Sequence, residues 1–482
     1  MIDALPGRRL ALAATLLCAA VAASGETSER RTTLDDQRGV AVTIYNENLA
    51  LIKDRREVPL AEGGQRLAFR GVSAQMRAET ALLRNLGQPG ALSVREQNFN
   101  YDLLTPQTLL EKYVGRKVRV AYRHPTTGAE TYEDARVLSA ANGVVLKIGD
   151  RIETGMPGRI IYDQVPDNLR DQPTLVLDLE SARGGRQELE LSYLSGGLSW
   201  QADYVAELNA DETQLDLQGW VTLNNRSGTR YRNALLQLVA GDVNQVTQQM
   251  QRAMPRGAVM AMADAEQAMS QESLFEYHLY TLGRPTTLQD NQTKQVALLS
   301  AAAVPVSKEY LLSGQSHYYR GQAGDLGRKL KVGVFMEFAN TEAHKLGKPL
   351  PKGVVRVYKR DQKQRAQFIG EDRIDHTPKG EDVRLRLGNA FDITADKRQT
   401  DYRKRAASGE YSHAAETAYS IELRNAKEVP VTVTVREPIP GDWRMIESSH
   451  EHEKVAAHMA EWQVKVPAEG EAELNYRVLV RY

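Results

Sequence analysis

The sequence has almost no cysteine. Its single cysteine, Cys18, lies in an N-terminal segment that has the features of a signal peptide. If that segment is removed, the mature chain has no thiol, which excludes disulfide bonds, zinc–thiolate sites and a cysteine nucleophile. The folded protein is therefore expected to be held together by its apolar cores alone.

Long apolar runs are also missing beyond the first residues. Arg8 and Arg9 precede an uncharged run, rich in Ala and Leu, from Leu10 to Ala23. This is the pattern of a secretory signal, and the run is shorter than the about 20 residues that a transmembrane helix needs. The sequence predicts a signal peptide at residues 1–24, a periplasmic location and no transmembrane helix after cleavage, with association to the outer membrane left open.

Neither sign of charge is in excess. Lys plus Arg and Asp plus Glu each number 62, so the net charge is zero. A general polyanion binder normally carries a basic surplus, so we expect no nucleic-acid partner. Phenylalanine is scarce, at 7 residues against 20 tyrosines, and tyrosine suits half-buried strand positions.

The usual signatures of hydrolases are absent as well. The chain has no G-x-S-x-G elbow and no H-E-x-x-H helix, and no motif for a cofactor stands out. The sequence therefore names no catalytic residue and no cofactor. Because carboxylates are plentiful, a glycosidase-like pair of Asp or Glu residues stays open, and enzymatic activity is undecided with a non-enzyme favoured.

The chain does contain a long series of short runs in which apolar and polar residues alternate, and turn-forming residues separate these runs. The pattern predicts a mainly β, multidomain fold. We expect the following parts: an N-terminal β region at 38–113, a small SH3-like barrel at 114–165, a β-sandwich at 166–245, a Met/Ala/Gln-rich helix or mobile linker at 246–273, and a C-terminal immunoglobulin-like sandwich at 274–482. Within the last part, the polar and basic stretch 396–413 is expected to be a loop.

Several ordered motifs carry a resemblance to a known family. They read LSWQADY at 198–204, NNRSG at 224–228, LVAGDVN at 238–244 and EPIPGDW at 437–443. In these motifs the chain resembles domain-of-unknown-function family 4139, bacterial envelope proteins of which some are called mucoidy-inhibitor-A-like. The resemblance implies export, β-sandwich architecture and a link to capsule or exopolysaccharide control. It supplies no catalytic residues.

Six residues within or near these motifs are candidates for a binding site. Aromatic rings can stack on the apolar faces of sugars while polar groups bind the hydroxyls, which would make these residues an aromatic and polar sugar-binding face. The alternative, which we favour for rings in strand runs, is core packing and turn stabilisation. The candidates are Trp200, Asp203, Trp220, Asn225, Asp242 and Trp443.

The densest histidine cluster is the weak candidate for a metal site. His450 and His452 share one face if the segment is a strand, and His458 lies across a turn. Tetrahedral zinc needs a third and usually a fourth ligand, so a solvent-exposed loop is the favoured interpretation and no metal site is predicted. The methionines of 246–273 could in principle bind Cu(I), but no cysteine or histidine nearby completes such a set.

The last strand keeps one further alternative open. Leu474, Tyr476, Val478, Val480 and Tyr482 share one face, as in the terminal strand of an outer-membrane β-barrel or the edge of a soluble sandwich. Taken together, the sequence favours an exported, non-enzymatic binding or structural protein with an envelope protein or surface polysaccharide as partner. The alternatives are a carboxylate-dependent polysaccharide hydrolase or modifying enzyme, and the outer-membrane barrel.

Overall fold

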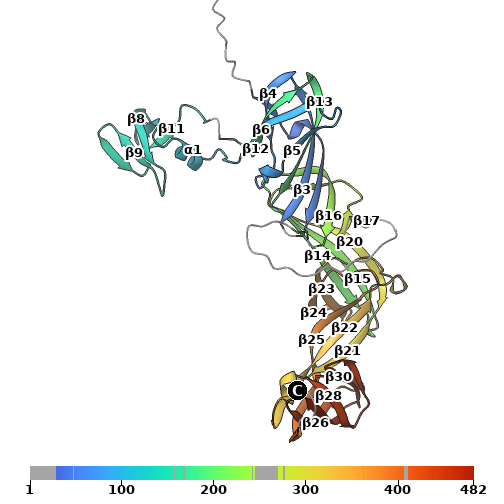
Figure 1. Ribbon diagram of the computed structural model, residues 1–482. Helices are drawn as coiled ribbons and strands as arrows, with labels where there is room; N and C mark the ends of the chain where they lie inside the picture. Colours follow the sequence, from blue (N-terminus) through green and yellow to red (C-terminus); the bar gives the residue numbers. More distant parts are fainter. Residues whose placement is uncertain are drawn as a thin grey trace, which may run out of the picture. The chain divides into compact units, whose positions relative to one another are not determined.

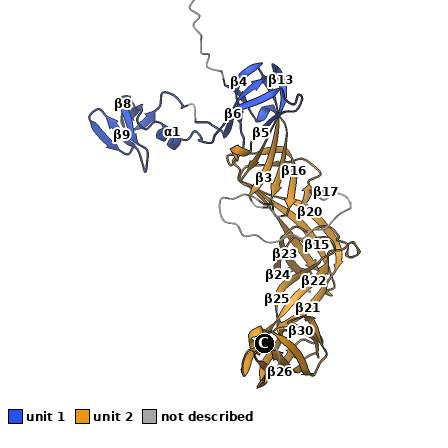
Figure 2. Ribbon diagram, in the orientation of Figure 1, with its two compact units in different colours: residues 1–37, 56–72, 83–190 blue, residues 38–55, 73–82, 191–482 orange. Residues whose placement is uncertain are grey.

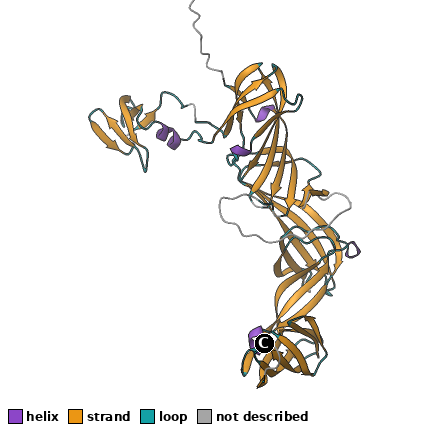
Figure 3. Cartoon of the chain, in the orientation of Figure 1, coloured by secondary structure: helices purple, strands orange, loops and turns teal. Residues whose placement is uncertain are grey.

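The computed structural model describes residues 29–46, 48–156, 158–166, 169–241, 243–244, 270–274, 277–361, 363–406 and 411–482. The predicted signal peptide and residues 246–269 of the Met-rich segment lie outside these ranges. Strands dominate the described residues (Figure 3), and the mainly β prediction is confirmed. Among the described residues there is one α-helix, α1 (Pro106–Lys112), and no helix long and apolar enough to cross a membrane.

The chain divides into two compact units (Figure 2). One contains residues 1–37, 56–72 and 83–190, and the other contains 38–55, 73–82 and 191–482. One sheet has eight strands. In sheet order these strands are β17 (Ser270–Leu274), β18 (Tyr277–Thr281), β16 (Tyr231–Ala240), β2 (Gln37–Tyr45), β3 (Leu49–Leu60), β13 (Gly185–Ser195) and β5 (Leu82–Asn85), with β19 (Thr286–Leu288) paired to β16.

The first unit holds two further sheets. The four-stranded one has the order β1 (Arg30–Thr32), β4 (Gly63–Arg70), β12 (Thr174–Ser181), β6 (Leu92–Asn100). The five-stranded one has the order β10 (Arg151–Thr154), β9 (Val145–Ile148), β8 (Glu130–Ser139), β7 (Lys117–Arg123), β11 (Arg159–Ile161). In the described strand pairing β10 and β11 do not meet, so the five strands expected of a small barrel form an open sheet.

The helix α1 belongs to the core of this open sheet. Thr105 caps its N-terminus by accepting from the Thr108 amide, and Pro106 at the first helical position has no amide to leave unpaired. Leu110 and Tyr113 at the other end pack with Val118 and Val120. Because Val118 and Val120 alternate with exposed Lys117 and Arg119, the strand presents one apolar face.

The second unit contains a five-stranded sheet that carries four of the sequence candidates, Trp200, Asp203, Trp220 and Asn225. Its order is β20 (Gln292–Pro305), β15 (Gln214–Asn225), β14 (Leu198–Leu208), β23 (Gly353–Arg360), β24 (Ala366–Ile374). In Figure 1, β14 and β15 are green, β20 is yellow, and β23 and β24 are orange. Along β14 the side chains of Trp200, Ala202, Tyr204 and Ala206 are buried, and the side chains between them face the other way. The sheet therefore has one buried face and one outer face.

The same unit ends in a nine-stranded sheet. Its order is β28 (Asp442–Ser448), β31 (Gly470–Arg481), β26 (Ala414–Asn425), β25 (Asp382–Arg405), β22 (Asp325–Ala339), β21 (Ser307–Ser313), β27 (Val431–Pro438), β30 (Met459–Val466), β29 (His452–Ala456). Leu474, Tyr476, Val478 and Val480 of β31 all lie in its core.

One part of this sheet corrects the sequence analysis. The stretch 396–413 was expected to be a loop, but β25 continues to Arg405 and pairs with β26 along Lys397 and Gln399. The buried positions of this strand still alternate, as Ile393, Ala395, Lys397 and Gln399. Two of these four residues are polar, so a search for alternating apolar residues does not detect this part of the strand.

Candidate functional site

Two of the sequence candidates, Asp203 and Trp220, meet on the outer face of the five-stranded sheet. They are directly opposite each other in the antiparallel pairing of β14 with β15. The next outward positions along these strands are Gln201 opposite Thr222 and Val205 opposite Gln218. Because outward side chains recur every second residue, these six side chains form one continuous surface.

Strand β20 extends this surface on the far side of β15. Gln295 lies opposite Thr222, Ala297 opposite Trp220, and Ser300 opposite Gln218. We call the outward side chains around Trp220 the Trp220 face. It consists of Gln201, Asp203, Val205, Gln218, Trp220, Thr222, Gln295, Ala297 and Ser300.

Asp203 is the hydrogen-bonding centre of the Trp220 face. Its Oδ2 accepts from Thr222 Oγ1 at 2.6 Å and from Gln201 Nε2 at 3.3 Å, and its Oδ1 accepts from Arg356 Nη1 at 3.0 Å. Burial acts to raise the pKa of Asp203, but the hydrogen bonds from Thr222, Arg356 and Gln201 outweigh it and the pKa is lowered. The side chain is therefore a carboxylate at neutral pH.

The network continues across the whole sheet. Gln295 Nε2 on β20 donates to Thr222 Oγ1 at 3.1 Å, and Arg356 on β23 also pairs with Glu371 of β24 at 3.1 Å. One chain of polar contacts thus crosses all five strands. It links the polar side chains beside Trp220 to one another.

Trp220 is the exposed tryptophan of the protein. Its residue is 37% exposed, against 4% for Trp200, 6% for Trp443 and 1% for Trp462. Its neighbours across the strands, Asp203 and Ala297, are both small side chains. The ring is therefore accessible within a surface of amides and hydroxyls.

Trp200 and Asn225 do not join the Trp220 face. Trp200 is buried on the opposite face of the sheet, and its indole nitrogen has no hydrogen-bond partner among the described residues. Asn225 is buried at the end of β15, where its Nδ2 donates to the carbonyl oxygens of Thr229 and Gln289 at 2.9 Å each. Its Oδ1 accepts from the Ser227 amide, so it holds the turn after β15. Asp242 lies outside the described residues.

Trp443 lies in the nine-stranded sheet, which is a different sheet from the one that carries the Trp220 face. It is buried, and its Nε1 donates to the Ala457 carbonyl at 2.9 Å. The ammonium of Lys454 lies 4.6 Å from the ring centroid. These contacts give Trp443 a packing role in its own sheet.

The three histidines have separate partners. His450 Nδ1 lies 2.9 Å from Ser449 Oγ, and His458 Nδ1 lies 3.0 Å from the Gly441 carbonyl. The His452 ring sits between Trp443 and Trp462, at 6.3 and 6.1 Å between centroids. Within the described residues no group of three His, Cys, Asp or Glu side chains could hold a metal ion.

Sequence reasoning missed a second polar cluster, in the core of the nine-stranded sheet. Lys397 of β25 and Glu437 of β27 form an ion pair at 2.6 Å, with side chains that are 2% and 0% exposed. Glu437 Oε2 also accepts from the Tyr319 hydroxyl at 2.9 Å, and Tyr319 lies 2.8 Å from the Tyr476 hydroxyl. Both oxygens of the carboxylate are thereby bound. We call these four residues the buried Lys–Glu cluster.

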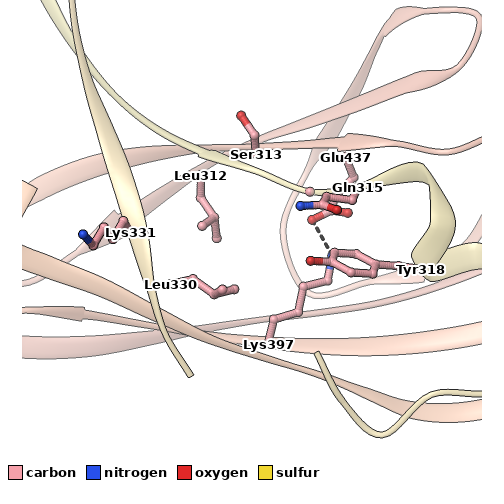
Figure 4. Close-up of a pocket in the computed structure, with 9 residues that line it drawn as sticks. Leu312, Ser313, Gln315, Tyr318, Leu330, Lys331, Lys397 and Glu437 are labelled. Atoms are coloured by element: carbon pink, nitrogen blue, oxygen red, sulfur yellow. Dashed lines mark hydrogen bonds and ion pairs between the residues drawn. The ribbon is translucent and has the colours of Figure 1, made fainter. Parts of the chain in front are cut away.

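Figure 4 shows a small cavity beside this cluster. It measures about 100 Å³, and Lys397, Glu437, Tyr318, Gln315 and Leu330 are among the residues that line it. The Lys397 ammonium lies 4.7 Å from the centroid of the Tyr318 ring. Burial lowers the pKa of Lys397 against the opposing effect of Glu437. A cavity of this size holds a few waters at most, so we assign the cluster a structural role.

Comparison with known proteins identifies the family. The model of a domain of unknown function (DUF4139) matches residues 189–482, more than half of the chain. The protein belongs to the DUF4139 family. The matched region contains the Trp220 face and the buried Lys–Glu cluster, and the resemblance seen in the sequence motifs is confirmed. No curated protein matches the chain.

Proposed function

We propose that this DUF4139 protein is an exported, non-enzymatic binding protein of the bacterial cell envelope, and that the Trp220 face is its binding surface. The observation that carries the proposal is the exposure of Trp220 beside an ordered set of amides and hydroxyls. Exposed aromatic residues among fixed polar groups are typical of recognition surfaces. Export is supported by the signal-like residues 1–24 and by the cysteine-free remainder of the chain.

The test is co-sedimentation of residues 25–482 with isolated cell envelopes. We expect the wild-type protein to pellet with envelopes and Trp220→Ala to remain in the supernatant. Phe391→Ala is the matched control, because Phe391 of β25 is another exposed aromatic residue, 95% exposed, outside the Trp220 face. Equal recovery of wild type and Trp220→Ala would reject this surface, and turnover of an envelope polysaccharide would reject the non-enzymatic proposal.

A further inference from the structure

The chemistry of the Trp220 face indicates what it would bind. Of its nine side chains only Asp203 is charged, and six of the others are three glutamines, a threonine, a serine and Trp220. A surface for a polyanion or polycation would present unpaired charges of the opposite sign. This surface instead presents neutral donors and acceptors around one aromatic ring, and the adjoining charge of Arg356 is paired with Asp203 and Glu371.

The charge of Asp203 is already compensated. Both oxygens of Asp203 are occupied by protein donors, and the Arg356 guanidinium that pairs with it is itself shared with Glu371. Asp203 is also buried. It therefore acts as a positioning residue, which orients Gln201 and Thr222 without contacting a ligand directly.

The glutamines keep hydrogen-bonding capacity that the described part of the chain does not use. Gln201 and Gln295 each donate once through Nε2, to Asp203 and Thr222, and no partner for their carbonyl oxygens is found among the described residues. An amide carbonyl accepts from a hydroxyl, and the second N–H of the same amide can donate to one. The two amides flank Thr222, one on each neighbouring strand.

From these contacts we infer that the Trp220 face binds an uncharged polysaccharide, with the indole of Trp220 stacked on a sugar ring and Gln201 and Gln295 bonded to its hydroxyls. The inference rests on the proposed function and gives its ligand a chemical class. Aromatic stacking supplies the apolar contact area, and the fixed amides supply orientation. A neutral ligand leaves the Asp203–Arg356 pair undisturbed.

Affinity electrophoresis in native gels tests the ligand class. The probes are a neutral galactomannan, a neutral β-glucan and, as the charged comparison, alginate, each cast into the gel over a concentration series. We expect retardation of wild type by at least one neutral polymer, unchanged by added salt because no ionic contact is involved. Trp220→Ala should weaken binding at least ten-fold, Gln201→Ala and Gln295→Ala several-fold, and Phe391→Ala should match wild type.

The outcomes separate this inference from the proposed function. Equal retardation of Trp220→Ala and wild type in the neutral gels overturns the inference, as does salt-sensitive retardation by alginate alone. If wild type ignores every neutral polymer but still pellets with envelopes in a Trp220-dependent manner, the ligand class is wrong and the binding surface stands. If Trp220→Ala loses neither activity, both proposals fail. Near-ultraviolet circular dichroism of each variant shows whether the fold is retained.

Discussion

Lys397 and Glu437 face each other across the core of the nine-stranded sheet, 2.6 Å apart and almost fully shielded from water. Their strands, β25 and β27, are not neighbours in the sheet order. The pair therefore links two strands that no backbone ladder joins. Moving two charges out of water is costly, and the hydrogen bond from the Tyr319 hydroxyl to the Glu437 carboxylate helps to offset this cost.

Removing one partner of this pair should be far more damaging than removing both. Lys397→Met leaves a buried carboxylate without its counter-ion, and we expect a loss of about 3–5 kcal/mol in unfolding free energy. The double variant Lys397→Met/Glu437→Leu should be less destabilised than either single variant, because no buried charge is left. Urea unfolding checks this, and additive losses in the double variant would show that the pair is not coupled.

The Glu437 carboxylate packs directly against Gly314. A Cβ at this position would collide with both carboxylate oxygens. Gly314→Ala should therefore displace Glu437 and cost about 1–3 kcal/mol, the usual range for overpacking. Gly321→Ala is the matched control, since a Cβ there meets nothing within 4 Å. Thermal unfolding of the two variants compares them, and equal melting temperatures would contradict the assigned contact.

The missed cluster shows where sequence patterns fail. In the second half of β25 the alternating buried positions include Lys397 and Gln399. From sequence alone, polar side chains of this kind are expected to face solvent. Whether a lysine is buried depends on a carboxylate forty residues away, and local periodicity carries no such information. By contrast, the last strand was predictable because apolar side chains fill every inward position of β31.

Asp203 should make stability depend on pH in the acid range. Its pKa is lowered in the folded protein relative to the unfolded value of about 3.9, so its contribution is full above that value and is lost as pH falls through the folded pKa. Asp203→Asn should cost about 1–3 kcal/mol at neutral pH, because Arg356 and the Thr222 hydroxyl lose the charged group that accepts their hydrogen bonds. As pH falls below the unfolded value, the gap between variant and wild type should shrink.

Urea unfolding from pH 7 down to the acid limit of folding measures this gap. Asp211→Asn is the control, because Asp211 is an exposed carboxylate in the turn between β14 and β15. It should follow wild type at every pH. A gap for Asp203→Asn that stays constant with pH would contradict the role of the charged form.

The three buried tryptophans should differ in their response to replacement by phenylalanine. Trp443 and Trp462 donate hydrogen bonds from Nε1, to the Ala457 carbonyl and to Ser448 Oγ, whereas Trp200 Nε1 has no partner among the described residues. All three substitutions remove a similar side-chain volume. The losses of stability should therefore differ mainly through the indole hydrogen bond that Trp443 and Trp462 make and Trp200 does not. We expect Trp200→Phe to be milder than the other two by about 1 kcal/mol in chemical unfolding. A larger loss for Trp200→Phe would run against this ranking.

The candidate binding residues were only partly predictable as a group. Asp203 and Trp220 are seventeen residues apart in sequence and meet because β14 and β15 pair in one specific register. Trp200 and Asp203 are three residues apart, and on one strand an odd separation puts two side chains on opposite faces. The sequence motif alone did not show that both residues lie on the same strand. The glutamines of the Trp220 face were missed because isolated amides on a strand carry no sequence signal.

Tryptophan quenching by acrylamide, with and without a bound envelope polysaccharide, tests the central claim most directly. Trp220 is the one tryptophan of four with substantial exposure, so it should account for most of the quenching of the free protein. If the Trp220 face is the binding surface, saturating polysaccharide should reduce the quenching constant of wild type to nearly that of Trp220→Phe. An unchanged quenching constant in the saturated complex would contradict the claim.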